Sequence, residues 1–240
     1  MKRLVLLALV GAILLHSIPT LSDDGFYVIA VGGGVGTKIT SLPYTITQPG
    51  FYYLKDNLST SLNGIIVNAN EVTLDLMGFS ITGPGSTSGQ GIYINGVKNV
   101  EVRNGNLKNF QVGIWATYDT ETRNFRLANI KVRGCNTGIQ GDAYGTVITC
   151  CEATTNVTGI LSNAYGGLID KNTSSFNSSY GFLIDDFKGI VTNNTATDNG
   201  KGFSFQLSNN PETLVDRNSS SRNGTNWENF TDCTKGLNTP

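Results

Sequence analysis

The chain has 240 residues, of which 15% are charged, and its formal net charge is −1 at pH 7. A nucleic-acid-binding protein normally carries a basic stripe, so this balance argues against a nucleic-acid partner. Charged residues normally make up about a quarter of a globular protein. Their low share here, with 29 glycines, favours short strands joined by tight turns over amphipathic helices.

Residues 1–22 predict a secretory signal peptide. Two cations, Lys2 and Arg3, precede an apolar run from Leu4 to Leu15. This run is short for a membrane span, which needs about 20 residues. We therefore expect a secreted, periplasmic or cell-surface protein with no membrane span after cleavage. An uncleaved N-terminal anchor is the alternative.

Residues 23–62 are assigned to an N-terminal cap with entry strands. The stretch "TITQPGFYYLKDNLST" looks like a strand segment that leads into a larger β-structure. The glycine-rich "VGGGVGTK" (31–38) fits neither a dinucleotide fingerprint nor a P-loop, and no helical pattern follows it. We expect a flexible entry turn there.

A repeat of about 22 residues follows the cap, which is the period of a solenoid whose units bury their apolar faces by stacking. "TGIQGDAYG" at 137–145 returns as "TGILSNAYG" at 158–166. Asn226-Trp227 resembles a degenerate eighth copy. A glycine followed by Ile or Phe recurs at Gly64, Gly91, Gly113, Gly138, Gly159, Gly181 and Gly202.

Alternation within each copy predicts β-structure. The residue after each glycine, and the second residue beyond that, are apolar or small, so both should point into a core. Three short segments of this kind per copy describe one coil of parallel strands. A further inward position recurs later in the copy, at Val132, Ala153, Ser174 or Ser175, Ala196 and Ser220.

Asparagines form a second repeating series. Asn156, Asn177, Asn199 and Asn223 come shortly before successive anchor positions, and Cys135 takes the corresponding place one copy earlier. Asn tolerates the left-handed backbone of a turn, and stacked Asn side chains about 4.8 Å apart can hydrogen-bond to one another. We therefore expect an asparagine ladder along one turn of the coil.

These features resemble the right-handed parallel β-helix proteins, which include pectate-lyase-like enzymes and repeat domains of secreted carbohydrate-associated proteins. The glycine anchors, the asparagine series, "VTLDLMGFSITG" (72–83) and "NVEVRNGNLKNF" (99–110) carry the resemblance. It implies an all-β fold, a single-stranded right-handed parallel β-helix of about seven or eight coils over residues 63–232, with 233–240 as a tail. It implies no single activity, because this fold carries many functions.

Alternation also predicts one outer face with two neighbouring columns. Residues two beyond each glycine form an aromatic-to-aliphatic column that begins with Tyr93 and Trp115, beside a column of hydrogen-bonding residues that includes Asn95 and Asn163. Sugars pack their C–H faces on aromatic rings and pair their hydroxyls with amides and carboxylates. We expect these four residues to contact a polysaccharide or a cell-surface protein; a face without a special role is the alternative.

Carboxylates in the hydrogen-bonding column offer an enzymatic alternative. Asp142 and Asp185 should lie two coils apart, about 9–10 Å, which is the upper limit for an inverting glycoside hydrolase. Asp186 adds a further carboxylate. Asp142 and Asp185 are also an alternative Ca²⁺ site, with the amide oxygen of Asn163 between them.

The resemblance argues against catalysis. "LIDDF" (183–187) has the Asp pair of polygalacturonase-like proteins, but the only histidine, His16, belongs to the predicted signal peptide, so their Gly-His-Gly is missing. No proline lies between Pro84 and Pro211, which excludes the Arg-x-Pro-x-x-Arg stretch of pectate lyases from the middle coils.

The cysteines indicate no cofactor. They show neither CxxC spacing nor a histidine partner, so zinc is not predicted, and a disulfide stays open without an indicated pairing. Adjacent Cys150 and Cys151 should point to opposite sides of a strand.

Our leading hypothesis is an extracytoplasmic module without catalytic motifs that binds carbohydrate or protein. The alternatives are a polysaccharide lyase or glycoside hydrolase acting through Asp142, Asp185 and Asp186, and a structural or adhesive surface protein.

Overall fold

The computed structural model describes residues 36–239, apart from 120, 208–211 and 231–232. The predicted signal peptide and residues 23–35 of the predicted cap lie outside the described residues. All regular elements in the described part are β-strands, and the strands pair in parallel. Within these ranges, no helix is long and apolar enough to cross a bilayer.

Two sheets contain all of these strands. The nine-stranded sheet is formed by β2 (Tyr44–Ile46), β5 (Ile65–Val67), β8 (Gln90–Ile94), β10 (Val112–Ala116), β12 (Thr137–Gly141), β15 (Thr158–Ser162), β18 (Tyr180–Asp185), β21 (Lys201–Gln206) and β24 (Thr225–Glu228). The 16-stranded sheet is formed by β1 (Thr37–Ile39), β3 (Gly50–Leu54), β4 (Leu58–Ser59), β6 (Val72–Asp75), β7 (Ser80–Thr82), β9 (Lys98–Lys108), β11 (Arg123–Arg133), β13 (Val147–Thr149), β14 (Glu152–Thr154), β16 (Tyr165–Asp170), β17 (Thr173–Ser175), β19 (Lys188–Thr192), β20 (Thr195–Thr197), β22 (Leu214–Asp216), β23 (Ser219–Ser221) and β25 (Thr234–Lys235).

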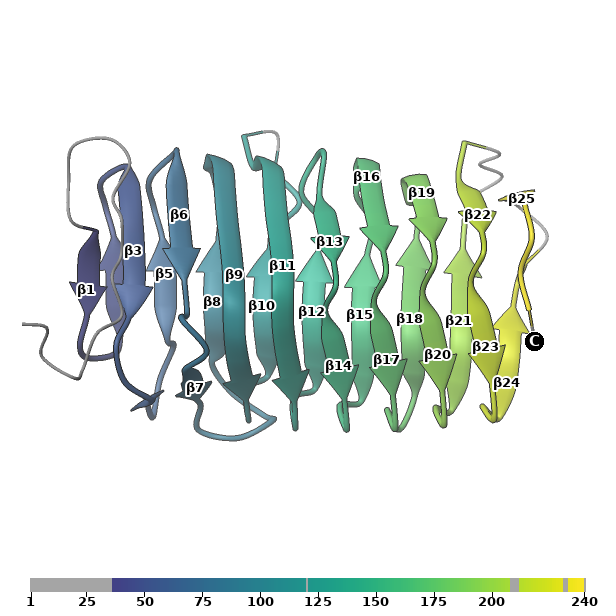
Figure 1. Cartoon of the computed structure of the whole chain (residues 1–240), viewed down its shortest axis with the longest axis horizontal. Coiled ribbons are helices and arrows are strands. Elements are labelled where there is room, and N and C mark those ends of the chain that lie inside the picture. The colour runs from purple at the N-terminus through teal and green to yellow at the C-terminus, as the bar shows by residue number, and fades with distance from the viewer. Residues whose placement is uncertain (1–35, 120, 208–211, 231–232, 240) are drawn as a thin grey trace, which may run out of the picture. The chain divides into compact units, whose positions relative to one another are not determined.

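Each coil passes through both sheets in turn. In the middle of the chain β9 and β11 are single strands of 11 residues, whereas later coils divide the same path into two short strands, such as β13 and β14. Figure 1 shows the nine-stranded sheet behind the other sheet, with its strands running the opposite way. The predicted fold class is confirmed: an all-β parallel solenoid of about eight turns.

The glycine anchors explain the stacking. A Cβ at Gly159 would lie 2.7 Å from the carbonyl oxygen of Gly181 in the next coil, closer than a side-chain carbon tolerates. Glycine therefore lets the coils approach at this corner, and every Ile and Phe that follows an anchor is fully buried. These residues stand in register as Ile65, Ile92, Ile114, Ile139, Ile160, Phe182 and Phe203, and Trp227 of the degenerate copy continues the series.

The later inward position is also confirmed. Ser174, rather than Ser175, stands in register with Ala153 and Ala196. Its hydroxyl donates a hydrogen bond of 2.7 Å to the carbonyl oxygen of Gly181, which satisfies a polar group in the core.

The core changes from aliphatic to aromatic toward the C-terminus. The ring of Phe203 stacks on Phe182 at 4.5 Å and on Trp227 at 4.7 Å between centroids. Phe230 extends this stack beyond Trp227, with the centroids of these two rings 4.7 Å apart. A stack of rings therefore fills the last coils, where the earlier coils use isoleucine.

The predicted asparagine series forms a hydrogen-bonded column. The Oδ1 of Asn177 accepts the backbone N–H of Asn156 at 2.9 Å, and the Oδ1 of Asn199 accepts both the backbone N–H and the amide of Asn177 at 2.9 Å. Cys135 heads the column, because its N–H is accepted by Asn156. The left-handed backbone lies one residue before each asparagine, for example at Phe176 (φ 54°), and not on the asparagine as we expected.

A second column of the same kind lies at the bend within the 16-stranded sheet, and the sequence reading missed it. Asn172, Asn194, Asn218 and Asn238 each accept the backbone N–H of the residue one coil before, and Cys151 heads this column. Each of these amides also donates to a backbone carbonyl, such as that of Ile169. Both columns are therefore saturated with hydrogen bonds.

The cysteines follow from these columns. Cys135 and Cys151 are buried at the heads of the two columns, and burial raises the pKa of their thiols to about 11 and about 12. Cys150 is exposed, so the two adjacent cysteines point to opposite sides, as predicted. The thiols of Cys135, Cys150 and Cys151 are free.

Candidate functional site

Both predicted columns lie on the outer side of the nine-stranded sheet. Tyr93 and Trp115 are half-buried and pack edge to face, with ring centroids 5.5 Å apart. The residues on either side of them in β8 and β10 point into the core. We call the hydrogen-bonding residues the polar column: Asn95, Thr117, Asp142, Asn163, Asp185 and Gln206.

Exposure varies along the polar column. Asn95 and Gln206 are exposed at its ends, and Asn163 and Asp185 are half-buried. Asp142, in contrast, is only 4% exposed, although the sequence predicted simply that it points outward. The middle of the face therefore contains a covered carboxyl group.

One oxygen of Asp142 is held by two donors. Its Oδ2 accepts the side-chain amide of Gln140 at 2.7 Å and, at a longer 3.3 Å, the indole N–H of Trp115 from the coil before. These contacts join the aromatic residue of one coil to the carboxyl group of the next. They also fix the orientation of the carboxyl group.

The other oxygen of Asp142 has no hydrogen-bond partner, and neither does the side-chain oxygen of Asn163; both atoms are buried. The backbone N–H of Asn163 comes near enough to lower the pKa of Asp142, but its geometry falls short of a hydrogen bond. At the N-terminal end of the column, in contrast, the Thr117 hydroxyl donates to the Asn95 oxygen at 2.6 Å.

Burial raises the pKa of Asp142 to about 6, and the charge of Asp185 adds to this effect. The hydrogen bonds to Oδ2 lower the pKa only in part. Burial, and then the charge of Asp186, also raise the pKa of Asp185. Asp142 and Asp185 are thus close enough to interact, two coils apart in one column, while Asp186 is exposed beside them.

A stack of three tyrosines follows the polar column where the chain leaves the nine-stranded sheet. Tyr144 lies 5.7 Å from Tyr118 and 5.6 Å from Tyr165 between ring centroids, and the hydroxyls of Tyr118 and Tyr144 are 3.2 Å apart. Tyr118 is 55% exposed. Lys188 continues the series, with its Nζ 5.1 Å from the Tyr165 ring centroid.

The sequence reading missed this tyrosine stack, although its signal was present. Tyr144 and Tyr165 are the shared tyrosines of the echoed strings "GDAYG" and "SNAYG". In the coils of Thr117 and Asn163 the polar residue therefore lies between an aromatic or aliphatic side chain and a tyrosine of the stack, whereas Asp142 lies between Gln140 and Tyr144.

The face ends earlier than predicted on its C-terminal side. Ser204 was expected to continue the aromatic-to-aliphatic column, but it is fully buried. Its hydroxyl donates to the carboxylate of Glu228 at 2.6 Å, and Lys201 pairs with that carboxylate at 2.6 Å. Since Glu228 belongs to the next coil, its side chain covers this end of the face.

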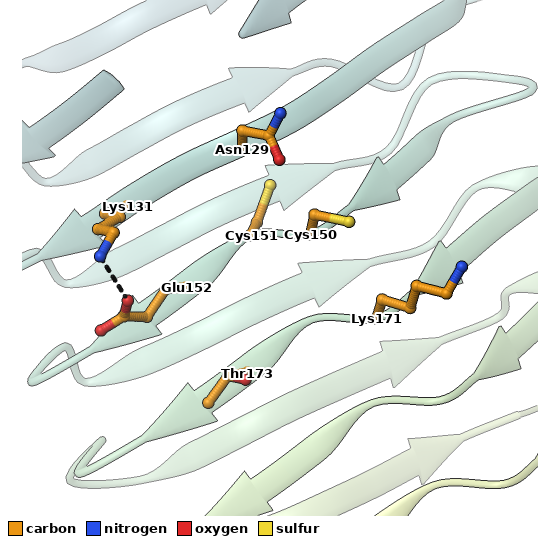
Figure 2. A pocket seen from close by; sticks show the side chains of 7 residues that line it. All are labelled: Asn129, Lys131, Cys150, Cys151, Glu152, Lys171 and Thr173. Carbon is orange, nitrogen blue, oxygen red and sulfur yellow. Dashed lines mark ion pairs between the residues drawn. The ribbon is translucent and has the colours of Figure 1, made fainter. Parts of the chain in front are cut away.

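A concave region lies on the other sheet, apart from the polar column. A groove of about 430 Å³ is lined by Asn129, Lys131, Cys150, Cys151, Glu152, Lys171 and Thr173. Lys131 pairs with Glu152 of the neighbouring strand at 3.2 Å, and Figure 2 shows this pair and the side chains of Cys150 and Cys151 pointing apart. The groove contains none of the residues that the sequence predicted for binding or catalysis.

Among the described residues, no group of three or more His, Cys, Asp or Glu side chains is arranged to hold a metal ion. The Ca²⁺ alternative raised from the sequence comprises two carboxylates, Asp142 and Asp185, and the Asn163 amide. One oxygen of Asp142 and the oxygen of Asn163 are the unpartnered acceptors in this set.

Comparison with protein families identifies the fold family. A family model described as a right-handed β-helix region matches residues 63–226. The chain belongs to this right-handed β-helix family. The match includes Asp142, Asn163, the tyrosine stack and both asparagine columns except Asn238. No curated protein matches the sequence.

A solved structure resembles the chain in fold. The A-module of the mannuronan C-5 epimerase AlgE4 from Azotobacter vinelandii aligns with a TM-score of 0.50 and 16% sequence identity, covering 79% of this chain and 68% of that one. At this identity the likeness shows a shared β-helix architecture and no more.

Proposed function

We propose that the protein is a secreted β-helix module that binds a glycan chain along the outer face of the nine-stranded sheet. The observation that carries this proposal is the polar column with aromatic rings on both sides. The Tyr93–Trp115 pair lies on one side and the tyrosine stack on the other.

The chemistry of this face suits sugars. Aromatic rings offer apolar surfaces for the C–H faces of pyranose rings, and the polar column offers amide and carboxylate oxygens to hydroxyl groups. Successive coils repeat these groups about every 4.8 Å. A repeating ligand can therefore meet the same kind of contact several times along the solenoid.

Secretion is part of the proposal. It is supported by the order of Lys2, Arg3 and the apolar run that follows, which is the layout of an export signal. A module outside the cytoplasm would meet polysaccharides and cell-surface proteins.

Retention of the purified protein in gels containing a panel of neutral, acidic and amino polysaccharides tests the proposal. We expect retention by at least one polymer, weakened about tenfold in Tyr118→Ala. Phe176→Ala is the matched control, because Phe176 is also an exposed aromatic residue, at 60%, and lies at a turn away from this face. Absence of retention, or equal weakening in both variants, would refute glycan binding at this face.

A carbohydrate-modifying enzyme is the second candidate, and Asp142 is the observation that favours it. A carboxyl group whose pKa is raised to about 6 suits a general acid or base near neutral pH. One solved β-helix that resembles this chain in fold is the A-module of a mannuronan C-5 epimerase. Asp185 and Asp186 would be the accompanying carboxylates.

Incubation of the same polymers with the protein, followed by assays for new reducing ends, unsaturated products and altered sugar configuration, tests this candidate. Turnover that disappears in both Asp142→Asn and Asp185→Asn would establish an enzyme. If a polymer were retained without any chemical change, the enzymatic candidate would be refuted and the proposed binding function would be supported.

A further inference from the structure

The two unpartnered oxygens on the polar column need a physical explanation. Asp142 Oδ1 and Asn163 Oδ1 are both acceptors, both are buried, and they belong to consecutive positions of one column. Burial of a polar atom without a partner costs about 1–3 kcal/mol, and more for a charged group. Two such atoms in adjacent coils, about 4.8 Å apart in backbone spacing, make an unusual local defect in a chain whose other stacked asparagines are satisfied.

A single proton removes the defect. A protonated carboxyl group is a donor, so an O–H on Asp142 Oδ1 satisfies that oxygen and the amide oxygen of Asn163 together. We propose that Asp142 is held as a neutral carboxylic acid that donates its proton to Asn163, and that loss of this proton opens the pair to a hydroxyl donor from the ligand. This regulation rests on the proposed glycan-binding function of the same face.

The groups around Asp142 agree with a neutral acid. Gln140 and Trp115 donate only to Oδ2. The charged group that acts on Asp142 is another carboxylate, Asp185, which itself has Asp186 beside it. Negative neighbours and burial both favour the protonated form.

The cations near this face are engaged elsewhere. Lys188 pairs with Glu212 at 3.1 Å and lies over the Tyr165 ring, and Lys201 pairs with Glu228. Beyond the column, the tyrosine stack contributes only phenolic hydroxyls. No charged donor among the described contacts of Asp142 therefore compensates an ionised Oδ1.

The proton controls what the face offers a ligand. While Asp142 is protonated, the Asp142–Asn163 pair is satisfied and gains nothing from a sugar hydroxyl. After deprotonation two acceptors, one of them charged, are available to a hydroxyl that moves in between them. Binding should therefore strengthen as the pH rises through about 6.

Urea unfolding between pH 4 and pH 7.5 tests the protonated state without any ligand. The pKa of Asp142 is raised from 3.8 to about 6, so the folded state binds more protons than the unfolded state in this window, and stability falls as the pH rises. Relative to Asp142→Asn, the unfolding constant of the wild type should rise about a hundredfold from pH 4 to pH 7.5.

Asp75→Asn is the matched control. Asp75 is equally buried, at 5%, but it accepts from Arg103 at 2.8 Å and from Asn104 at 3.1 Å. Asp75→Asn should therefore destabilise the protein near neutral pH, whereas Asp142→Asn should stabilise it. If Asn163 instead turned its amide N–H toward an ionised Asp142, the hundredfold change would be absent, and that result would overturn the proposal.

The retained polymer provides the second arm. Wild-type retention should be about tenfold stronger at pH 7.5 than at pH 5, and in Asp142→Asn it should be weak and independent of pH. Retention that does not depend on pH would refute control of binding by the Asp142 proton, but it would still support glycan binding. If no polymer were retained but the unfolding constant still changed about a hundredfold between pH 4 and pH 7.5, the proposed function would be refuted. The proposal that Asp142 is a neutral acid in the folded protein would still be supported.

Discussion

The two asparagine columns and the polar column are built from similar side chains, stacked once per coil, yet they differ in how their hydrogen bonds are completed. Asn177 in the first asparagine column accepts from Asn156 and donates to Asn199, Ser174 and the carbonyl oxygen of Ala153. Asp142 in the polar column leaves one oxygen without a partner. Satisfied stacks hold neighbouring coils together, whereas the unsatisfied positions are the ones at which we propose that a ligand binds.

The difference follows from where the stacks lie. The asparagine columns stand at bends where a left-handed residue turns the chain, so each amide meets the backbone groups that the bend frees. The polar column stands at the end of regular strands, where the backbone groups are already paired in the sheet. Its side chains must therefore find partners from other side chains or from a ligand.

The largest expected effect is the loss of a satisfied amide. Asn177→Ala removes four hydrogen bonds and leaves the Asn156 N–H and the Ala153 carbonyl buried without this partner. At about 1–3 kcal/mol for each unsatisfied group, we expect a loss of about 4 kcal/mol of unfolding free energy, measured by urea denaturation. Ser178→Ala, at the exposed neighbouring residue, is the control. A loss under 1 kcal/mol in Asn177→Ala would contradict a structural role for this column.

A smaller effect should follow from removal of the donor to Asp142. Gln140→Leu deletes the 2.7 Å hydrogen bond to Oδ2, which raises the pKa of Asp142 further because the charged form loses a donor. We expect a loss of about 1–2 kcal/mol at pH 7.5 and almost none at pH 4, since the neutral acid depends less on this donor. The exposed Gln206 of the same column provides the control, Gln206→Leu. An equal loss at both pH values would show that Gln140 contributes only packing.

The smallest effect concerns the end of the tyrosine stack. Lys188→Ala removes a cation–π contact with Tyr165 and an exposed ion pair with Glu212. Contacts of this kind contribute little, so we expect a loss of about 0.5–1 kcal/mol that shrinks at high salt. Thermal unfolding at two salt concentrations measures it. A loss above 2 kcal/mol would mean that the stack is a structural column and not an open surface.

The repeat made much of the fold predictable. A period near 22 residues, marked by a recurring glycine followed by Ile or Phe, identified the strand register of the nine-stranded sheet. The second asparagine column was missed although Asn172, Asn194 and Asn218 recur at nearly the same interval. Their signal was missed because no Gly-Ile or Gly-Phe anchor follows them within a few residues, as Gly159, Gly181 and Gly202 follow the asparagines of the first column.

The candidate site was only partly predictable. Alternation identified the outward columns, but it could not predict that Trp115 of one coil reaches Asp142 of the next, or that Glu228 covers Ser204. Both contacts join coils of unequal length, and side-chain reach across coils is not encoded in the period. The burial of Asp142, on which the site depends, follows from such contacts.

The most direct test of the account uses the two tryptophans of the chain as paired probes. The indole N–H of Trp115 donates to Asp142 on the polar face, whereas Trp227 packs on Phe203 at the end of the core. In ¹⁵N–¹H NMR spectra recorded while the retained polysaccharide is added at pH 7.5, we expect the Trp115 indole signal to shift and the Trp227 signal to stay. A shift of the Trp227 signal alone, or of neither signal, would contradict a glycan-binding face centred on Asp142.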